Sequence, residues 1–305
     1  MLDIIGPLKL VKAQGKAAYP YCHCLYVDGE VKALFDTGAG KRSLAELPPE
    51  KVDMVFYTHF HTDHTNGHGM FNNAFYHIHL LDYPPMVSRE KYMYYTGTHL
   101  WRELVGEPVL DYGKLMRERH PDPDFPDVGF REKNIDRTFK DGEVFDFGQT
   151  RAVALHTPGH TPGHTAFFFE QEGVVFTGDI DLIKTGPWYG AYLSNIDDFI
   201  DSIKKIKQLK ARVLVSCHRR PLTENIENEL DAYLGRLLEQ ERQVLEALRV
   251  PASLDELAAK GIIYSRHPHA FYLFWEKIML VHHLERLERQ GRVVLEGEKW
   301  RLTGR

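Results

Sequence analysis

The chain has 305 residues, 43% of them hydrophobic and 27% charged, and a formal net charge of −5 with neutral histidines. This length allows a large buried core and a smaller second domain. The modest acidic charge indicates neither a nucleic-acid nor a membrane partner, and no segment reads as a signal peptide or membrane span. Three cysteines do not suggest a disulfide framework, so we expect a cytoplasmic protein.

Segments rich in β-branched and aromatic residues predict strands through the first two thirds of the chain. The expected strands cover residues 24–29, 31–38, 52–59, 74–80, 151–157, 164–171, 173–179 and 211–218. Apolar residues at helical spacing predict a helix over 194–210, with acids early and lysines late as the helix dipole favours. Together these elements predict sheets packed against each other with helices outside.

Two regions depart from this pattern. Residues from about 82 to 136 are interpreted as an inserted helical hairpin and loop, whose aromatic residues either line a substrate cavity or pin the insert to the body. After residue 222 the pattern turns helical and ends in two short β segments, which is the order of a winged-helix unit. We therefore predict a first domain at 1–222 and a winged-helix-like domain at 223–305.

The expected last helix of this unit is largely apolar in "LFWEKIMLVHHL", and residues 229–305 carry as many acidic as basic side chains. A helix that reads a DNA groove needs basic and polar side chains. The composition therefore favours packing over nucleic-acid recognition in the C-terminal region.

The segment "THFHTDHTNG" crowds histidines and an aspartate at the end of an expected strand. His59 and His61 lie two residues apart, with Asp63 and His64 just beyond. Neutral imidazoles beside carboxylates are typical metal ligands. Because one catalytic ion takes few ligands and keeps a position open, two metals accommodate this cluster better.

Further histidines and an aspartate follow three later strands. "LHTPGHTPGHTAFFF" contains His156, His160 and His164, "GVVFTGDID" contains Asp179, and "RVLVSCHRRP" contains His218. Their recurrence at strand ends predicts that they converge at one edge of a sheet pair, around a dinuclear metal site.

In this order, "HFHTDH", "TPGHTPGH", "FTGD" and "SCH" resemble the metal motifs of the metallo-β-lactamase fold hydrolases, and "LFDTG" around Asp36 resembles the family's aspartate-containing turn. The resemblance covers about residues 10 to 220. It implies an α/β fold, the αββα sandwich, with two divalent metal ions between loops at one edge. Zinc is the expected metal, with iron, manganese and nickel as alternatives.

The resemblance also implies two sets of ligands. The first metal is held by His59, His61 and His160, the second by Asp63, His64 and His218, and Asp179 bridges them. Asp36 and His164 are expected to contact ligands or loops through hydrogen bonds rather than to bind metal.

Such a pair of ions would hold a hydroxide nucleophile near neutral pH, and Asp63, the expected catalytic residue, would orient it and pass its proton to the leaving group. Trp188 and Tyr189 follow Asp179 closely and are either walls of the substrate site or anchors of their loop.

The C-terminal extension resembles the branch of the family that contains lactamase-like endoribonucleases and acyl-carrier-protein thioesterases. We expect a hydrolase acting on a thioester, ester or lactone carbonyl of a small molecule, because a nuclease would need a track of Lys and Arg. A metal-dependent phosphodiesterase or endoribonuclease is the first alternative. A protein that binds nucleic acid through its winged helix is the second, and a homodimer is left open.

Overall fold

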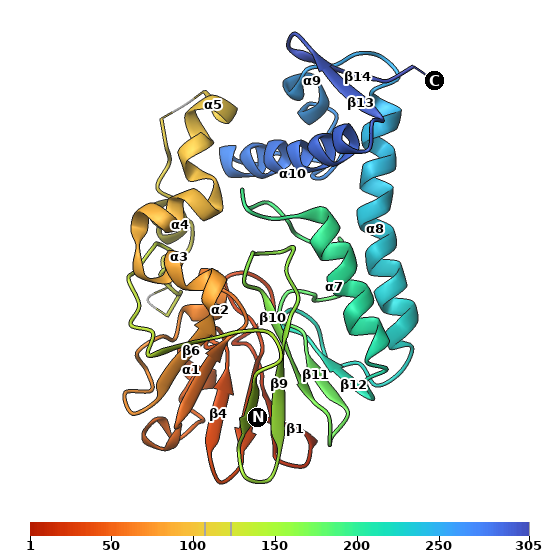
Figure 1. Cartoon of the computed structure of the whole chain (residues 1–305). Helices are drawn as coiled ribbons and strands as arrows, with labels where there is room; N and C mark the ends of the chain where they lie inside the picture. The colour runs from red at the N-terminus through yellow and green to blue at the C-terminus, as the bar shows by residue number, and fades with distance from the viewer. Residues whose placement is uncertain (107, 123, 305) are drawn as a thin grey trace.

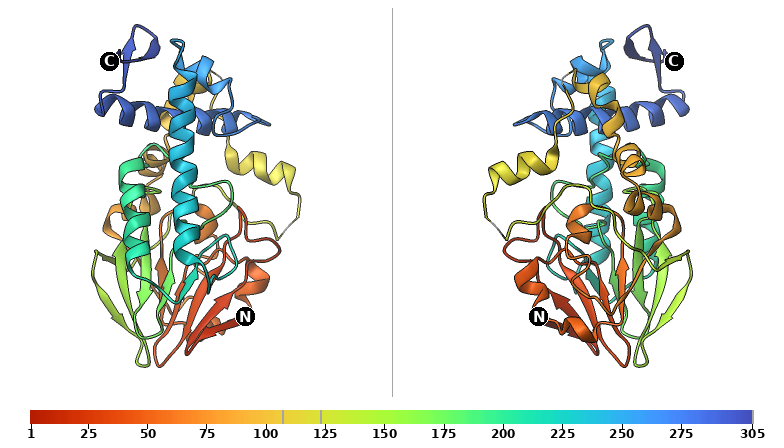
Figure 2. Two further views of the ribbon diagram at one scale, coloured as in Figure 1. Left: turned by 90° about the vertical axis from the view of Figure 1, so that its right-hand side faces the viewer. Right: turned by 90° about the vertical axis from the view of Figure 1, so that its left-hand side faces the viewer.

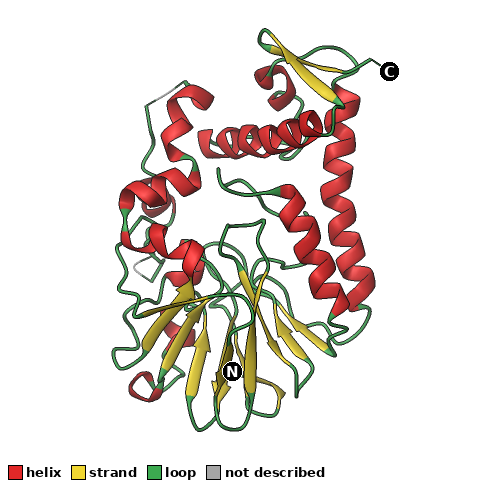
Figure 3. Ribbon diagram, in the orientation of Figure 1, coloured by secondary structure: helices red, strands yellow, loops and turns green. Residues whose placement is uncertain are grey.

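The computed structural model describes residues 1–106, 108–122 and 124–304. Two β-sheets face each other with helices around them (Figure 1; Figure 3). The larger sheet has the order β1 (Leu2–Ile5), β2 (Leu8–Val11), β3 (Cys24–Asp28), β4 (Lys32–Phe35), β5 (Met54–Tyr57), β6 (Phe75–His79) and β7 (Arg137–Phe139). The second has the order β12 (Val213–Val215), β11 (Val174–Phe176), β10 (Thr165–Phe169), β9 (Arg151–His156) and β8 (Val144–Asp146).

Strand direction decides where the loops of the site emerge. In the larger sheet β4, β5, β6 and β7 are parallel, and in the second sheet β11 and β12 are parallel. Since parallel strands end at the same edge of a sheet, the segments that follow β4 and β5 emerge together, as do those that follow β11 and β12.

Aromatic side chains fill the space between the sheets. Phe35 of β4 stacks on Phe56 of β5 with ring centroids 5.0 Å apart, and it meets Phe167 of β10 edge-on at 4.7 Å. All three are fully buried. Each such side chain contributes about 1.5–3 kcal/mol by leaving water, so this cluster holds the two sheets face to face.

Two helices cover the outer face of the second sheet, α7 (Ile196–Gln208) and α8 (Ile226–Ala247). Ile196, Phe199 and Ile203 recur at helical spacing on the buried side of α7, in one cluster with β11 and β12 residues. The expected helix at 194–210 is thus present and buries the face that its periodicity predicts.

The insert between β6 and β7 is a chain of short helices rather than the single hairpin that we expected. It contains η2 (Leu80–Asp82), α3 (Tyr83–Val87), α4 (Arg89–Thr96), η3 (Thr98–Leu100), α5 (Trp101–Val105) and α6 (Tyr112–Arg119). Gly97 and Gly106 end α4 and α5 with φ values of 81° and 78°, a conformation that glycine adopts without strain. Glu107 and Pro123 of the insert lie outside the described residues.

The C-terminal part continues from α8 through α9 (Leu254–Ala258) and α10 (Ala270–Arg289) to the ribbon of β13 (Val293–Glu296) and β14 (Lys299–Leu302). The element order is the expected one, and the region has a hydrophobic cluster of its own. The α10 helix crosses the end of α8 above the sheets (Figure 1; Figure 2). The winged-helix classification and the boundary at residue 222 stay predictions.

The remaining helices are α1 (Lys41–Leu44), η1 (Pro49–Lys51) and α2 (Thr62–Thr65). The eight expected strands are present, but β1, β2, β7 and β8 were not predicted. Each of these short strands contains a charged residue, which interrupts the apolar run that marks a strand in the sequence. Within the described ranges, no helix is long and apolar enough to cross a membrane.

Candidate metal centre

The residues predicted to bind metal lie in loops at one edge of the two sheets. His59 follows β5, and His61 caps the short helix α2 that carries Asp63 and His64. His160 lies between β9 and β10, Asp179 follows β11 and His218 follows β12. The fold therefore gathers segments that are up to 159 residues apart, counted as 218 − 59.

Three imidazoles of the first predicted group meet nitrogen to nitrogen. His59 Nε2 lies 3.0 Å from His61 Nδ1, and His160 Nε2 lies 3.1 Å and 2.9 Å from these two atoms. Asp179 Oδ2 is 3.3 Å from His160 Nε2 and 3.9 Å from His59 Nε2. These are separations that several ligands bound about 2 Å from one ion would have.

The hydrogen bonds behind this group leave lone pairs at its centre. His160 donates from Nδ1 to the carbonyl oxygen of Trp188 at 2.8 Å, and His59 Nδ1 lies 3.0 Å from the hydroxyl of Thr58. Burial lowers the pKa of His59, His61 and His160, so the rings are neutral. In a neutral ring one nitrogen carries the hydrogen, so Nε2 of His59 and of His160 are left as acceptors that need a cation.

A second group adjoins the first through Asp179. Asp179 Oδ1 lies 3.0 Å from His64 Nε2 and 3.3 Å from His218 Nε2, and Asp63 Oδ2 lies 3.4 Å from His218 Nε2. Despite this proximity, the geometry gives buried His64 Nε2 and Asp179 Oδ1 no hydrogen bond in the described part of the chain. Orphaned buried atoms of this kind fit a bound divalent ion.

The charges of the second group also favour a bound cation. Burial works to lower the pKa of His218, but the Asp179 and Asp63 carboxylates outweigh it and raise this pKa to about 10. The ring is therefore protonated when only these groups surround it. A metal ion would replace this proton, because only a neutral ring nitrogen can bind metal.

Asp36 supports the second group from behind. It follows β4 with a φ of 62°, is fully buried, and its Oδ2 lies 2.8 Å from His64 Nδ1. Its Oδ1 accepts the backbone N–H of Thr58 at 2.8 Å. Asp36 thus holds both a proposed ligand and the start of the His59 loop, as expected for a residue that orients ligands.

His164 also lies behind the centre. Its Nδ1 donates to the Thr157 carbonyl oxygen at 2.9 Å, and its Nε2 accepts the backbone N–H of Asp179 at 3.1 Å. Both ring nitrogens are occupied by backbone groups, which favours a role for His164 in positioning the loop of Asp179 over a role as a ligand.

A third cluster lies deeper and joins Cys22, Asp36, His64 and Cys217. His64 Nδ1 already bonds to Asp36, and Cys217 Sγ donates to Asp36 Oδ2 at 3.4 Å. Burial raises the pKa of both thiols, so they stay protonated and poor metal ligands. Cys217 therefore contacts the centre without being needed as a ligand.

The structure separates the roles of Trp188 and Tyr189. The half-buried ring of Trp188 lies 5.4 Å from that of His61 and 5.5 Å from that of His160, between centroids, which keeps it as a proposed wall of the substrate site. Tyr189 is fully buried, and its hydroxyl donates to Gln240 Oε1 at 2.8 Å. This geometry favours the interpretation of Tyr189 as a loop anchor.

Two residues near the centre were missed from the sequence. Asp82, fully buried, accepts hydrogen bonds from Phe60 N, Thr161 Oγ1 and Gly163 N, and so ties the two histidine loops together. The sequence did hold a signal for Asp82: it comes soon after β6, which lies beside β5, the strand that His59 follows. Tyr233 of α8 donates to Asp181 Oδ1 at 2.8 Å and lies 3.2 Å from the carbonyl oxygen of Asp179, and nothing in the helical pattern marks it.

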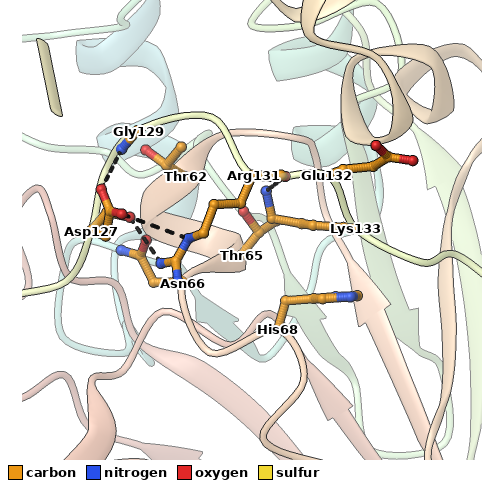
Figure 4. Close-up of a pocket in the computed structure, with 9 residues that line it drawn as sticks. All are labelled: Thr62, Thr65, Asn66, His68, Asp127, Gly129, Arg131, Glu132 and Lys133. Atoms are coloured by element: carbon orange, nitrogen blue, oxygen red, sulfur yellow. Dashed lines mark hydrogen bonds and ion pairs between the residues drawn. The ribbon is translucent and has the colours of Figure 1, made fainter. Parts of the chain in front are cut away.

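A cavity of about 110 Å³ lies beside α2, on which Asp63 and His64 stand. It is lined by Thr62, Thr65, Asn66, His68, Asp127, Gly129, Arg131, Glu132 and Lys133 (Figure 4). Arg131 turns to Asp127, and Lys133 donates to the carbonyl oxygen of Arg131. None of the proposed ligands lines this cavity, so it is separate from the metal centre.

Known proteins resemble this chain in sequence and in fold. The family model of the metallo-beta-lactamase superfamily matches residues 20–218, which include every proposed ligand. The chain belongs to the metallo-beta-lactamase superfamily. The expected fold is thereby confirmed, and the expectation of a superfamily hydrolase is confirmed at the level of the superfamily.

Several curated relatives have thioesterase or hydrolase names, and two of them illustrate the range. An atrochrysone carboxyl ACP thioesterase of Aspergillus fumigatus is 26% identical over 72% of this chain and 57% of its own length. A hydroxyacylglutathione hydrolase of Bartonella henselae is 31% identical over 40% of this chain and 51% of its own length. The chain thus spans about half the length of the curated relatives that it matches.

Solved structures resemble the whole chain, including its C-terminal helices. A metallo-beta-lactamase family protein from Thermus thermophilus is 24% identical, with a TM-score of 0.70 over 97% of this chain and 99% of its own. A beta-lactamase domain protein from Burkholderia ambifaria is 15% identical, with a TM-score of 0.67 over 99% and 93%. At these identities the likeness concerns the fold alone.

Proposed function

We propose that this superfamily member is a hydrolase that holds two divalent ions and cleaves a thioester of a small acyl substrate, with esters and lactones as related substrates. The observation that carries the proposal is the pair of ligand groups joined by the two oxygens of Asp179. Bound zinc, or else iron, manganese or nickel, would supply Lewis acidity that lowers the pKa of water and polarises a carbonyl oxygen.

The side chains divide the remaining work. His59, His61 and His160 would hold one ion, and Asp63, His64 and His218 the other, with Asp179 between them. The Asp63 side chain is 7% exposed, whereas that of His64, in the same group, is fully buried. We assign Asp63 as the group that takes a proton from the attacking water and gives it to the leaving thiolate. Water oxygen bonds to the carbonyl carbon, the C–S bond breaks, and an acid and a thiol result.

Two features favour a carbonyl over a phosphodiester. Among the described residues, Asp63 and Asp179 form ion pairs with histidines alone, whereas a nuclease needs Lys and Arg along its substrate. Aromatic rings stand beside the centre instead: Trp188 adjoins His61, and Trp275 of α10 adjoins Trp188 at 6.1 Å. The names of the curated relatives favour the thioester among carbonyl substrates.

The phosphodiesterase or endoribonuclease is the first alternative, and the nucleic-acid-binding protein is the second. Against the second, α10 buries its apolar residues in three hydrophobic clusters, among them Phe274, Met279 and Leu284. A helix packed in this way has little surface to place in a DNA groove.

The test is hydrolysis by the zinc-reconstituted protein of acyl thioesters, lactones and an activated phosphodiester. Asp63→Ala should fold normally but lose most of its turnover, about 100-fold or more, since it removes a ligand and a proton carrier together. Asp201→Ala is the matched control, because this aspartate of α7 has a side chain that is 78% exposed. Cleavage of the phosphodiester alone would favour the first alternative, and near-normal turnover by Asp63→Ala would contradict the dinuclear assignment.

A further inference from the structure

The first ligand group depends on one backbone carbonyl. The Trp188 carbonyl oxygen accepts the Nδ1 hydrogen of His160 at 2.8 Å, which sets the ring's orientation and directs its Nε2 lone pair towards His59 and His61. If this carbonyl turned away, the ring would lose the bond that selects its tautomer. The position of the Trp188 carbonyl is therefore part of the proposed metal site.

That carbonyl belongs to the peptide group that joins Trp188 to Tyr189, and the Tyr189 side chain is anchored in the C-terminal helices. Its ring is fully buried, and its hydroxyl donates to Gln240 Oε1 of α8 at 2.8 Å. The same hydroxyl oxygen lies 2.8 Å from Nε2 of His283 on α10, a fully buried residue. Because the single hydroxyl hydrogen goes to Gln240, Nε2 of His283 donates the hydrogen of this second bond. Because the peptide plane ends at the Cα of Tyr189, this anchor restricts how the carbonyl can turn.

Neighbouring contacts hold the same loop to α10 and to the segment of His160. His282 of α10 donates from Nε2 to the Ala191 carbonyl oxygen at 2.8 Å, and the Ser194 hydroxyl donates to the carbonyl oxygen of His160 at 2.8 Å. The loop between β11 and α7, which carries Trp188, is thus fixed at Tyr189 and at Ala191 by a helix that follows it by about ninety residues, as the separation of 94 between Tyr189 and His283 shows.

We propose that Tyr189 and His283 are positioning residues of the first metal site, through which α10 orients His160 by way of the Trp188 carbonyl. This gives the C-terminal region a role in completing the metal centre. It rests on the ligand assignment made under the proposed function, and it does not depend on which substrate is cleaved.

The test is metal binding by the full-length chain, measured as zinc content and as competition with a chromophoric chelator. Tyr189→Phe keeps the ring and removes the hydroxyl, and His283→Leu removes the opposite partner. Each variant should lower the affinity for one of the two zinc ions about tenfold and leave the affinity for the other near that of the wild type. Loss of a group behind a ligand costs about 10–100-fold in metal affinity. His283→Gln should restore the affinity, because its amide nitrogen reaches about where Nε2 stood and donates the same hydrogen bond.

Leu284→Ala is the matched control for lost stability. Leu284 is the next residue on α10, is fully buried, and packs in a cluster with Val244 and Leu257 that contains no residue of the Trp188 loop. The variant should melt at a lower temperature and bind both zinc ions normally. An equal loss of zinc affinity in Leu284→Ala and Tyr189→Phe would overturn the proposal, because a general loss of stability of the fold would then explain both.

Unchanged zinc affinity in Tyr189→Phe and His283→Leu would also overturn it. A wild-type protein that binds two zinc ions and cleaves no member of the substrate panel would sink the proposed hydrolase function and leave this inference standing. A wild-type protein that binds no zinc would sink the ligand assignment, and this inference with it.

Discussion

Single residues hold the two histidine loops in place, and Asp82 does so with three hydrogen bonds to groups of both loops. Burial nevertheless raises the pKa of this carboxyl from 3.8 to about 7. In the unfolded chain it ionises near its ordinary pKa, so between these values folding retains a proton that unfolding releases. The stability due to the protonated form is complete below pH 3.8 and is lost as the pH rises through 7.

We therefore expect Asp82→Asn, which cannot titrate, to differ most from the wild type at low pH. The wild type should be more stable at pH 5, and this advantage should shrink by roughly 2–3 kcal/mol as the pH rises to about 8. Urea unfolding of both proteins across this range measures the difference. Parallel stability curves would show that Asp82 does not carry the proton.

Gly38 shows how closely the chain approaches the helix of the second ligand group. A Cβ at this position would lie 1.5 Å from the carbonyl oxygen of Asp63 and 2.6 Å from Cys22 Sγ. Gly38→Ala should therefore displace α2 and cost roughly 3 kcal/mol or more of the free energy of unfolding.

Urea unfolding of Gly38→Ala measures this cost, and Gly235→Ala is its control. Gly235 lies within α8 with no atom within 4 Å of an added Cβ. This control should be neutral or gain about 0.5–1 kcal/mol, because alanine favours helix over glycine. If Gly38→Ala were as stable as the wild type, α2 would be able to shift away from residue 38 without a cost in free energy.

Among the elements, the insert is held to the body by Trp101 at the start of α5. Its ring is fully buried, with centroids 4.6 Å from Phe271 and 5.0 Å from Phe274 of α10. Of the two interpretations of the insert's aromatic residues, pinning the insert to the body applies to Trp101. The insert and the C-terminal helix thus form one packed unit.

Trp101→Ala should lower the free energy of unfolding by about 3–5 kcal/mol, because it leaves a large cavity between α5 and α10. Tyr94→Ala, at a side chain that is 45% exposed, should change it by less than about 1 kcal/mol. Thermal melting followed by circular dichroism compares the two. Equal melting temperatures would mean that the insert folds independently of α10.

For the whole molecule, the proposed metal centre joins loops of both sheets. Its proposed ligands follow β5, β9, β11 and β12, so ions bound there would add further links between these segments. Without ions the neutral imidazoles of the first group face one another with lone pairs, and the protonated His218 must be held by carboxylates.

Removal of metal by a chelator should therefore lower the melting temperature. For each ion the loss is RT ln(1 + [L]/Kd), about 4 kcal/mol when free metal exceeds Kd a thousandfold. The loss should grow as the pH rises from 7 to 9 at a fixed concentration of free zinc, because His218, with a pKa of about 10, holds a proton that competes with the metal for the same lone pair at lower pH. Differential scanning calorimetry with and without chelator measures it, and identical melting would contradict metal binding in the loops.

The amino-acid sequence alone predicted the αββα fold and the histidines and aspartates that the structure brings together in the two proposed ligand groups. The ligands stand directly after apolar strands or within one short motif, and local patterns of this kind are visible in a linear chain. The tertiary structure alone decided what holds the ligands. The bonds from Tyr189 to His283, from Thr161 to Asp82 and from Tyr233 to Asp181 span 94, 79 and 52 residues. A single hydrogen bond between distant residues leaves no periodic trace in either segment, so the supporting role of the C-terminal helices emerged only once the chain was folded.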